Sequence, residues 1–179
     1  KREGHSVRLF DATYYSVDYG IDSDGSKADN LNVMPFDPNE KGIRMKTSSW
    51  ADDLRKEFDD FDPDLIAMST TEDMWNLGIT LLDSIRDRVE RGKIPVIVGG
   101  VFPTFAPDLV AAHDLVTMVC IGEGEEALVD LSYRIGRGIT YENVTNLWVK
   151  TEDGRLVKNA VTKPVDINSL PILDLSLFE

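Results

Sequence analysis

Short apolar segments alternate with amphipathic segments through the middle of the chain. Three of the apolar segments have the length of a β-strand, and they cover residues 64–68, 94–98 and 116–121. Between them, apolar residues recur every three or four positions, which predicts helices over residues 73–90 and 107–112. Continuous apolar strands separated by helices are typical of a parallel sheet that is buried on both faces. We therefore expect an α/β fold of the flavodoxin-like or Rossmann-like type, with three layers.

A further amphipathic helix precedes the first of these strands. It is predicted to begin at Ser48 or Ser49, whose hydroxyl can accept a hydrogen bond from a free backbone amide, and to end near Phe58. Trp50, Leu54 and Phe58 recur every four residues, and this narrow apolar stripe is expected to contact the core.

The N-terminal part predicts less regular structure. Val7–Phe10 has the composition of a strand, and the residues before it resemble the last turn of a helix. This pattern leads us to expect that the sheet here lacks its first strand and helix. Polar residues 22–29 predict a loop, and Leu31–Phe36 is compatible with a short edge strand.

The C-terminal part has a different pattern. Residues 146–150 and 155–158 alternate apolar and polar positions around an Asp-Gly turn, which predicts a β-hairpin. An extended linker that contains proline follows. We therefore expect an α/β domain over residues 1–140, with a divergent insertion at 14–46, and a hairpin with a linker over residues 141–179.

Charge and composition exclude several classes of partner. The 179 residues include 32 acidic and 19 basic ones, which gives a net charge of -13 without a basic cluster. Such a chain repels polyanions, so nucleic acid and anionic membranes are not expected partners. No apolar run has the length of a membrane span. The single cysteine, Cys120, cannot form an internal disulfide, and we expect a core residue and a cytoplasmic protein.

Small and polar residues follow directly after three of the predicted strands. These loops are Ser69–Asp73, Gly99–Gly100 and Gly122–Glu125, and the last of them begins a helix over residues 123–135. The loops that leave the carboxyl ends of neighbouring parallel strands line one crevice, where ligands bind. We therefore expect the three loops to form a single site.

The residue types in these loops suggest the kind of ligand. Gly99 and Gly100 allow a flat ligand to approach the backbone, and the hydroxyl of Ser69 can donate and accept hydrogen bonds. Amides at the start of the last helix are free, but Glu123 and Glu125 beside them disfavour a phosphate. The chain also contains no G-x-x-x-x-G-K and no G-x-G-x-x-G motif. A large, nearly neutral ligand that carries amides fits best, although each loop taken alone is compatible with a simple turn or helix cap.

Several segments together resemble a known family. The chain looks like the cobalamin-binding domain that precedes the catalytic barrel in B12-dependent radical S-adenosylmethionine (SAM) proteins. The resemblance covers nearly the whole chain outside residues 14–46. It is carried by the segments 4–11, 63–69, 98–104, 121–127, 146–149 and 170–174.

The wider B12-binding family has a three-part fingerprint, D-x-H-x-x-G, S-x-L and G-G. Ser69–Thr71 resembles the second part with threonine in place of leucine, and the 27 residues between Thr71 and Gly99 agree with the family spacing. The first part is absent, because neither His5 nor His113 lies in such a motif. The resemblance then implies that no histidine of this chain is the lower ligand of cobalt.

The resemblance also implies which residues hold the cofactor and what lies elsewhere. The full protein would be an enzyme that also uses a [4Fe–4S] cluster, S-adenosylmethionine and a C-terminal radical SAM barrel, for methyl transfer or a related radical reaction. One cysteine cannot bind that cluster, so this stretch is expected to be non-catalytic and to hold no metal-ligating residue. The implied cobalamin-binding residues are Ser69, Thr70, Thr71, Glu72, Gly99, Gly100, Val101, Phe102, Pro103, Thr104, Gly122, Glu123, Gly124 and Glu125.

Three other functions are compatible with the same sequence. A flavodoxin-like domain can bind flavin mononucleotide at the same edge of the sheet. A phosphoacceptor receiver domain would need several aspartates at strand ends, and only Asp11 follows a predicted strand directly. A degenerate domain could keep the fold as an interaction surface and bind no cofactor.

Overall fold

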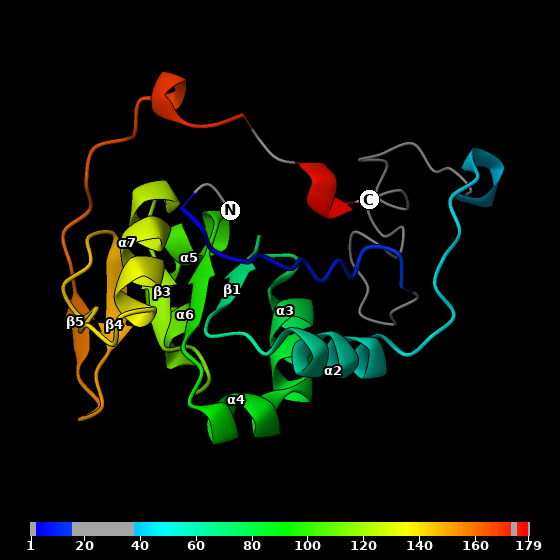
Figure 1. Cartoon of the computed structure of the whole chain (residues 1–179), viewed down its shortest axis with the longest axis horizontal. Coiled ribbons are helices and arrows are strands. Elements are labelled where there is room, and N and C mark those ends of the chain that lie inside the picture. Colours follow the sequence, from blue (N-terminus) through cyan, green and yellow to red (C-terminus); the bar gives the residue numbers. More distant parts are fainter. Residues whose placement is uncertain (1–2, 16–37, 173–174, 179) are drawn as a thin grey trace.

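A computed structural model describes residues 3–15, 38–172 and 175–178, and its centre is one five-stranded sheet (Figure 1). The strands lie in sequence order across the sheet. The pairs β1–β2 and β2–β3 are parallel, whereas β3–β4 and β4–β5 are antiparallel. The strands are β1 (Ile66–Ser69), β2 (Val96–Gly99), β3 (Met118–Cys120), β4 (Leu147–Lys150) and β5 (Leu156–Lys158). The predicted α/β class is confirmed, and the predicted hairpin extends the sheet.

Helices cover both faces of the sheet. They are α2 (Trp50–Phe61), α3 (Trp75–Ser84), α4 (Arg86–Gly92), α5 (Val101–Phe105), α6 (Pro107–Ala112) and α7 (Glu125–Ile135). Short 3₁₀ helices occupy Pro38–Lys41, Ile167–Ser169 and Leu175–Phe178. Ser49 caps α2 through a hydrogen bond from the amide of Asp52, as predicted.

The two faces of the sheet contribute to two separate core clusters. Val96, Val98 and Val119 point to one face, where they pack with α3, α4 and α6. Ile97 and Met118 point to the other face, where they pack with α7. The alternation follows from the pleat of the strands, in which successive side chains point to opposite faces.

The helix predicted over residues 73–90 is wrong as a single element, because it breaks at Ile85. The Nε of Arg55, from α2, donates to the carbonyl of Ser84 at 3.0 Å, and the Ser84 hydroxyl bonds to the carbonyl of Leu81 at 2.7 Å. At the same point the Arg88 amide bonds to the carbonyl of Ile85 instead of that of Ser84. This exchange of partners separates α3 from α4.

Three N-terminal predictions have different outcomes. Val7–Phe10 is extended and largely exposed but forms no strand among the described residues, so that prediction is wrong. Within the described part of the chain, β1 pairs only with β2, and its outer edge carries no neighbouring strand. The loop predicted at 22–29 and the edge strand predicted at Leu31–Phe36 lie outside the described residues.

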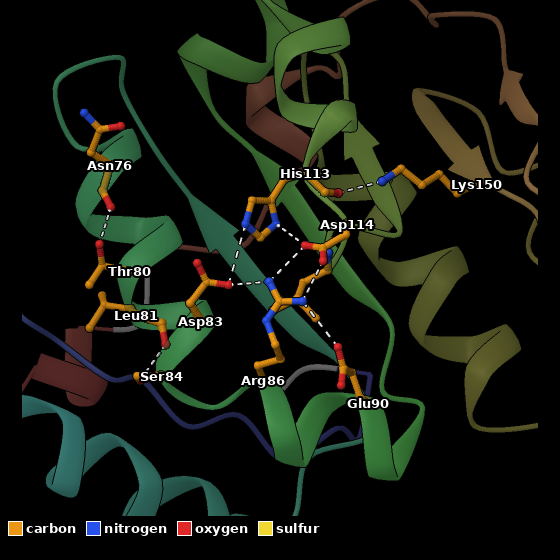
Figure 2. Close-up of polar contacts among 11 residues, drawn as sticks. Asn76, Thr80, Leu81, Asp83, Ser84, Arg86, Glu90, His113, Asp114 and Lys150 are labelled. Atoms are coloured by element: carbon orange, nitrogen blue, oxygen red, sulfur yellow. Dashed lines mark hydrogen bonds and ion pairs between the residues drawn. The ribbon is translucent and has the colours of Figure 1, made fainter.

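A polar network joins α3, α4 and the connection from α6 to β3 (Figure 2). Arg86 bonds to Asp114 through both terminal nitrogens, at 2.6 and 3.0 Å, and also to Asp83 at 2.6 Å and Glu90 at 3.3 Å. Arg86 lowers the pKa of Asp114 to about 2. His113, the residue that ends α6, lies between Asp83 and Asp114. This network lies at the amino end of β3, away from the three loops, and its role is structural.

Candidate functional site

A cavity of about 640 Å³ opens at the carboxyl ends of β1, β2 and β3. We call it the carboxyl-edge cavity. The side chains of its floor come from the sheet face that α7 covers. Its lining consists of Ala67, Met68, Ser69, Ile97, Gly99, Gly100, Val101, Thr104, Phe105, Cys120, Gly122, Glu123, Gly124, Glu125 and Leu128.

The first two loops contact each other backbone to backbone at Gly100. This glycine has φ 107° and ψ -167°, a conformation that is open almost only to glycine. A Cβ atom there would lie 2.7 Å from the carbonyl oxygen of Thr70 and 3.0 Å from its nitrogen. The Thr70 amide also donates to the carbonyl of Gly99 at 3.0 Å. Gly100 therefore keeps the β1 and β2 loops in direct contact.

Thr104 connects the second loop to the third. Its hydroxyl donates to the carbonyl of Gly100 at 2.8 Å and accepts from the Gly122 amide at 3.0 Å. Gly122 has φ 74°, and a Cβ atom on Gly124 would lie 3.3 Å from the sulfur of Cys120. The three loops thus form one connected rim around the cavity.

The structure brings together most of the predicted site residues but not all of them. Ser69, Gly99, Gly100, Val101, Thr104, Gly122, Glu123, Gly124 and Glu125 line the cavity. The other five predicted residues, Thr70, Thr71, Glu72, Phe102 and Pro103, are not part of its lining.

These five residues have other surroundings. Thr70 is 5% exposed, and its hydroxyl bonds to the carbonyl of Thr71 at 2.8 Å. Glu72 is exposed, like Thr71. Phe102 packs against the ring of Trp75, with the ring centroids 5.5 Å apart, and Pro103 is buried.

Sequence reasoning missed the apolar part of the lining, which includes Ala67, Ile97, Phe105 and Leu128. The strand period of two offered a signal for Ala67, because it shares a face with Ser69. Leu128 offered a weaker signal, since its contribution depends on how α7 packs across the sheet.

Charged groups lie at the rim, Ile97 and Cys120 are buried inside the cavity, and Phe105 is exposed at its mouth. Glu123 and Glu125 are exposed at the start of α7. Burial raises the pKa of the Cys120 thiol, and the charge of Glu125 raises it further. The cavity can therefore take up a ligand with an apolar body and neutral polar groups more readily than an anion.

Neither a metal site nor a membrane span is present in the described part of the chain. No group of three or more histidine, cysteine, aspartate or glutamate residues there could hold a metal ion. None of its helices combines the length and apolar character that crossing a bilayer requires.

Comparisons with known proteins agree on one family. A family model described as the B12 binding domain matches residues 38–132. The chain is 28% identical to 4'-phospho-dehydrooxetanocin synthase of Priestia megaterium over 138 residues. The aligned residues make up 74% of this chain and 18% of that protein.

Solved structures give the same result. The chain is similar to the cobalamin-dependent S-adenosylmethionine radical enzyme OxsB with aqua-cobalamin and S-adenosylmethionine bound, with a TM-score of 0.55 and 25% identity over 68% of this chain and 17% of OxsB. It also has the fold of part of the radical S-adenosylmethionine methyltransferase TsrM from Kitasatospora setae, with a TM-score of 0.54 and 18% identity over 68% of this chain and 25% of TsrM. The chain thus spans a quarter or less of the length of these proteins.

Proposed function

This chain belongs to the B12-binding domain family, and from that premise we propose that cobalamin binds in the carboxyl-edge cavity. The observation that carries the proposal is the connected rim, in which Gly100 and Thr104 join the loops after three neighbouring strands. Cobalamin is a large ligand with an apolar ring system and many amide groups. Such a ligand fits an apolar floor that is surrounded by backbone amides and glycines.

Different lining residues would make different kinds of contact with this ligand. Ile97, Phe105 and Leu128 provide apolar contact area, and the backbone of Gly99 and Gly100 allows close approach. Ser69, which is exposed at the end of β1, can exchange hydrogen bonds with an amide group. The apolar side chains exclude water from the part of the ligand that they cover.

The remaining predicted residues are proposed to act at the margin. Thr71 and Glu72 can contact parts of the ligand that extend beyond the cavity, since both are exposed. Thr70, Phe102 and Pro103 support the loop backbone from behind, because each is partly or fully buried.

Cobalt would receive no histidine ligand from the described part of this chain. Neither His5 nor His113 lines the cavity, and His113 belongs to the polar network at the amino end of β3. When bound, cobalamin supplies a cobalt centre that can carry a methyl group or take part in radical chemistry. The role of the chain is to hold the cofactor and leave one face open to a neighbouring domain.

We propose that the full protein is a B12-dependent radical SAM enzyme. The similarity to OxsB, which is described as a cobalamin-dependent radical enzyme, supports this assignment. The [4Fe–4S] cluster and S-adenosylmethionine would bind in a barrel of the same protein, since a chain with one cysteine cannot bind the cluster. Methyl transfer or a related radical reaction would take place there, in the cytoplasm.

The outer edge of β1 suggests where a further strand and helix would lie. Ala67 and Ser69 are exposed on this strand and line the cavity. A strand added at this edge would place its connecting helix beside the cavity and cover these positions.

Flavin mononucleotide is the alternative ligand, because flavodoxin-like sheets bind it at the same edge. The glutamates at the rim oppose it, since its phosphate is anionic. Titration of the protein in its full natural length with hydroxocobalamin and, separately, with flavin mononucleotide decides between them. We expect the visible spectrum to change with hydroxocobalamin up to one equivalent and no binding of the flavin. Flavin binding, or the binding of neither ligand, would contradict the proposal.

A further inference from the structure

The C-terminal segment that follows β5 is fastened to the third loop of the site by a single buried side chain. That side chain belongs to Asn146, which directly precedes β4 and is only 5% exposed. Its backbone has φ 65°, a left-handed conformation that asparagine tolerates better than most residues.

The side chain of Asn146 forms hydrogen bonds with two segments, the third loop of the site and the C-terminal segment. Its Nδ2 donates to the carbonyl of Glu123 at 2.8 Å. Its Oδ1 accepts from the Thr162 amide at 2.7 Å and from the Thr162 hydroxyl at 3.1 Å. Because a carbonyl must face a donor and an amide nitrogen must face an acceptor, this set of partners fixes the orientation of the side chain.

A second contact joins the same two segments. The amide of Val165 donates to Oε2 of Glu123 at 2.7 Å, so Glu123 is held through its backbone by Asn146 and through its side chain by the C-terminal segment. A Cβ atom on Gly122 would lie 3.7 Å from Val161. Residues 161–165 therefore pack along the outside of the loop that forms the rim.

The hydrogen bonds continue from this loop into the rest of the site. Gly122 donates to Thr104, and Thr104 donates to Gly100, the residue that touches the β1 loop. A connected series of contacts thus leads from the C-terminal segment through Asn146 to all three loops. Connected hydrogen bonds of this kind, centred on the buried Asn146, restrict the conformations of the segments that they join.

We propose that Asn146 is a positioning residue that couples the position of residues 161–165 to the shape of the carboxyl-edge cavity. The inference rests on the proposed function in one respect, which is that this cavity holds cobalamin. A movement of residues 161–165 would then change cofactor affinity without touching the cofactor. Preorganised loops bind more tightly because less ordering remains to be done on binding.

The test compares Asn146→Gly with Asn159→Gly in the protein of full natural length. Glycine accepts the left-handed backbone of position 146, so the first variant removes the side-chain bonds without adding strain. Asn159 is the matched control, because its Nδ2 also bonds to main-chain carbonyls, those of Glu142 and Leu147 at 2.8 Å, but does not contact the loop.

Two readouts are measured for each variant. The first is hydroxocobalamin affinity, which we expect to fall about tenfold in Asn146→Gly and by less than about twofold in Asn159→Gly. The second is amide hydrogen exchange at Gly122 and Val165, whose bonds do not involve Asn146 itself. We expect both amides to exchange faster in Asn146→Gly and to keep their protection in Asn159→Gly.

The two readouts separate the inference from the proposed function. If the unmodified protein binds no cobalamin, the proposed function fails, and the exchange rates alone decide whether Asn146 couples the two segments. Equal exchange at Gly122 and Val165 in the two variants would overturn the coupling. Unchanged affinity in Asn146→Gly, together with faster exchange, would overturn its role in cofactor binding.

Discussion

Replacing Gly100 with alanine should destabilise the protein more than any ordinary surface change. The backbone at φ 107° disfavours any side chain, which costs about 1–3 kcal/mol of the free energy of unfolding. The new methyl group would also lie 2.7 Å from the carbonyl oxygen of Thr70. Because that oxygen belongs to the backbone, it can move away only if the β1 loop moves. Such overpacking costs about 1–3 kcal/mol more.

The expected total loss is about 2–6 kcal/mol. This is a large part of the free energy of unfolding of a typical domain, which is about 5–15 kcal/mol. Gly138→Ala is the matched control, because Gly138 has φ 63° but no atom within 4 Å of the added methyl group. A left-handed backbone alone should cost the control about 1–2 kcal/mol. The difference between the two variants therefore contains the contact between the loops together with the greater backbone strain at Gly100, whose φ of 107° is less open to alanine than the φ of 63° at Gly138.

Urea unfolding followed by tryptophan fluorescence measures both costs, and hydroxocobalamin titration below the transition measures binding. We expect Gly100→Ala to lose both stability and affinity, because the movement of the Thr70 carbonyl reshapes the cavity. Gly138→Ala should keep its affinity. The reasoning is refuted if the two variants lose the same stability, since that result would mean that the β1 and β2 loops are not in contact.

Three further predictions concern the framework around the site. The protein should become less stable as the pH drops from about 4 toward 2, because Arg86 lowers the pKa of Asp114 from 3.8 to about 2. Thermal unfolding should show a smaller loss of stability over this pH range in Asp114→Asn than in the unmodified protein. Identical pH profiles of the two proteins would refute the ion pair. The effect should be modest, since the Asp114 side chain is 69% exposed. Leu131→Ala should cost about 2–5 kcal/mol in urea unfolding, because Leu131 is fully buried where α7 packs on the sheet, and a cost below about 1 kcal/mol would contradict that packing. The buried Cys120 thiol, whose pKa is raised, should react with Ellman's reagent far more slowly in the native protein than in urea, and equal rates would show that it is exposed.

The parts of the fold that follow from local patterns were predictable from the sequence. The strands β1, β2 and β3 carry continuous apolar runs, and α6 and α7 show the helical period. Glycines at 99–100 and at 122 and 124 marked two of the three loops, because each follows a strand directly. The placement of these loops on one edge then follows from the parallel order of the strands.

The parts that depend on contacts between distant residues were not predictable in this way. At the break at Ile85, the Ser84 carbonyl accepts a hydrogen bond from Arg55, which is 29 residues away in the chain, and the local helical pattern gives no sign of this contact. The short helix α5 begins at Val101, beyond a glycine whose conformation depends on its contact with Thr70. The floor of the cavity depends on strand register and on the position of α7, so Leu128 could not be assigned from its own segment.

The measurement that tests the central claim most directly is hydroxocobalamin affinity in Leu128→Trp and Val129→Trp. Both residues are apolar and partly exposed on α7, at 39% and 46%, but only Leu128 lines the carboxyl-edge cavity. A tryptophan at position 128 would occupy space that we assign to cobalamin, whereas one at position 129 would not. We predict that Leu128→Trp weakens binding at least about tenfold and that Val129→Trp binds like the unmodified protein. Equal affinity in the two variants would contradict the assignment of cobalamin to this cavity.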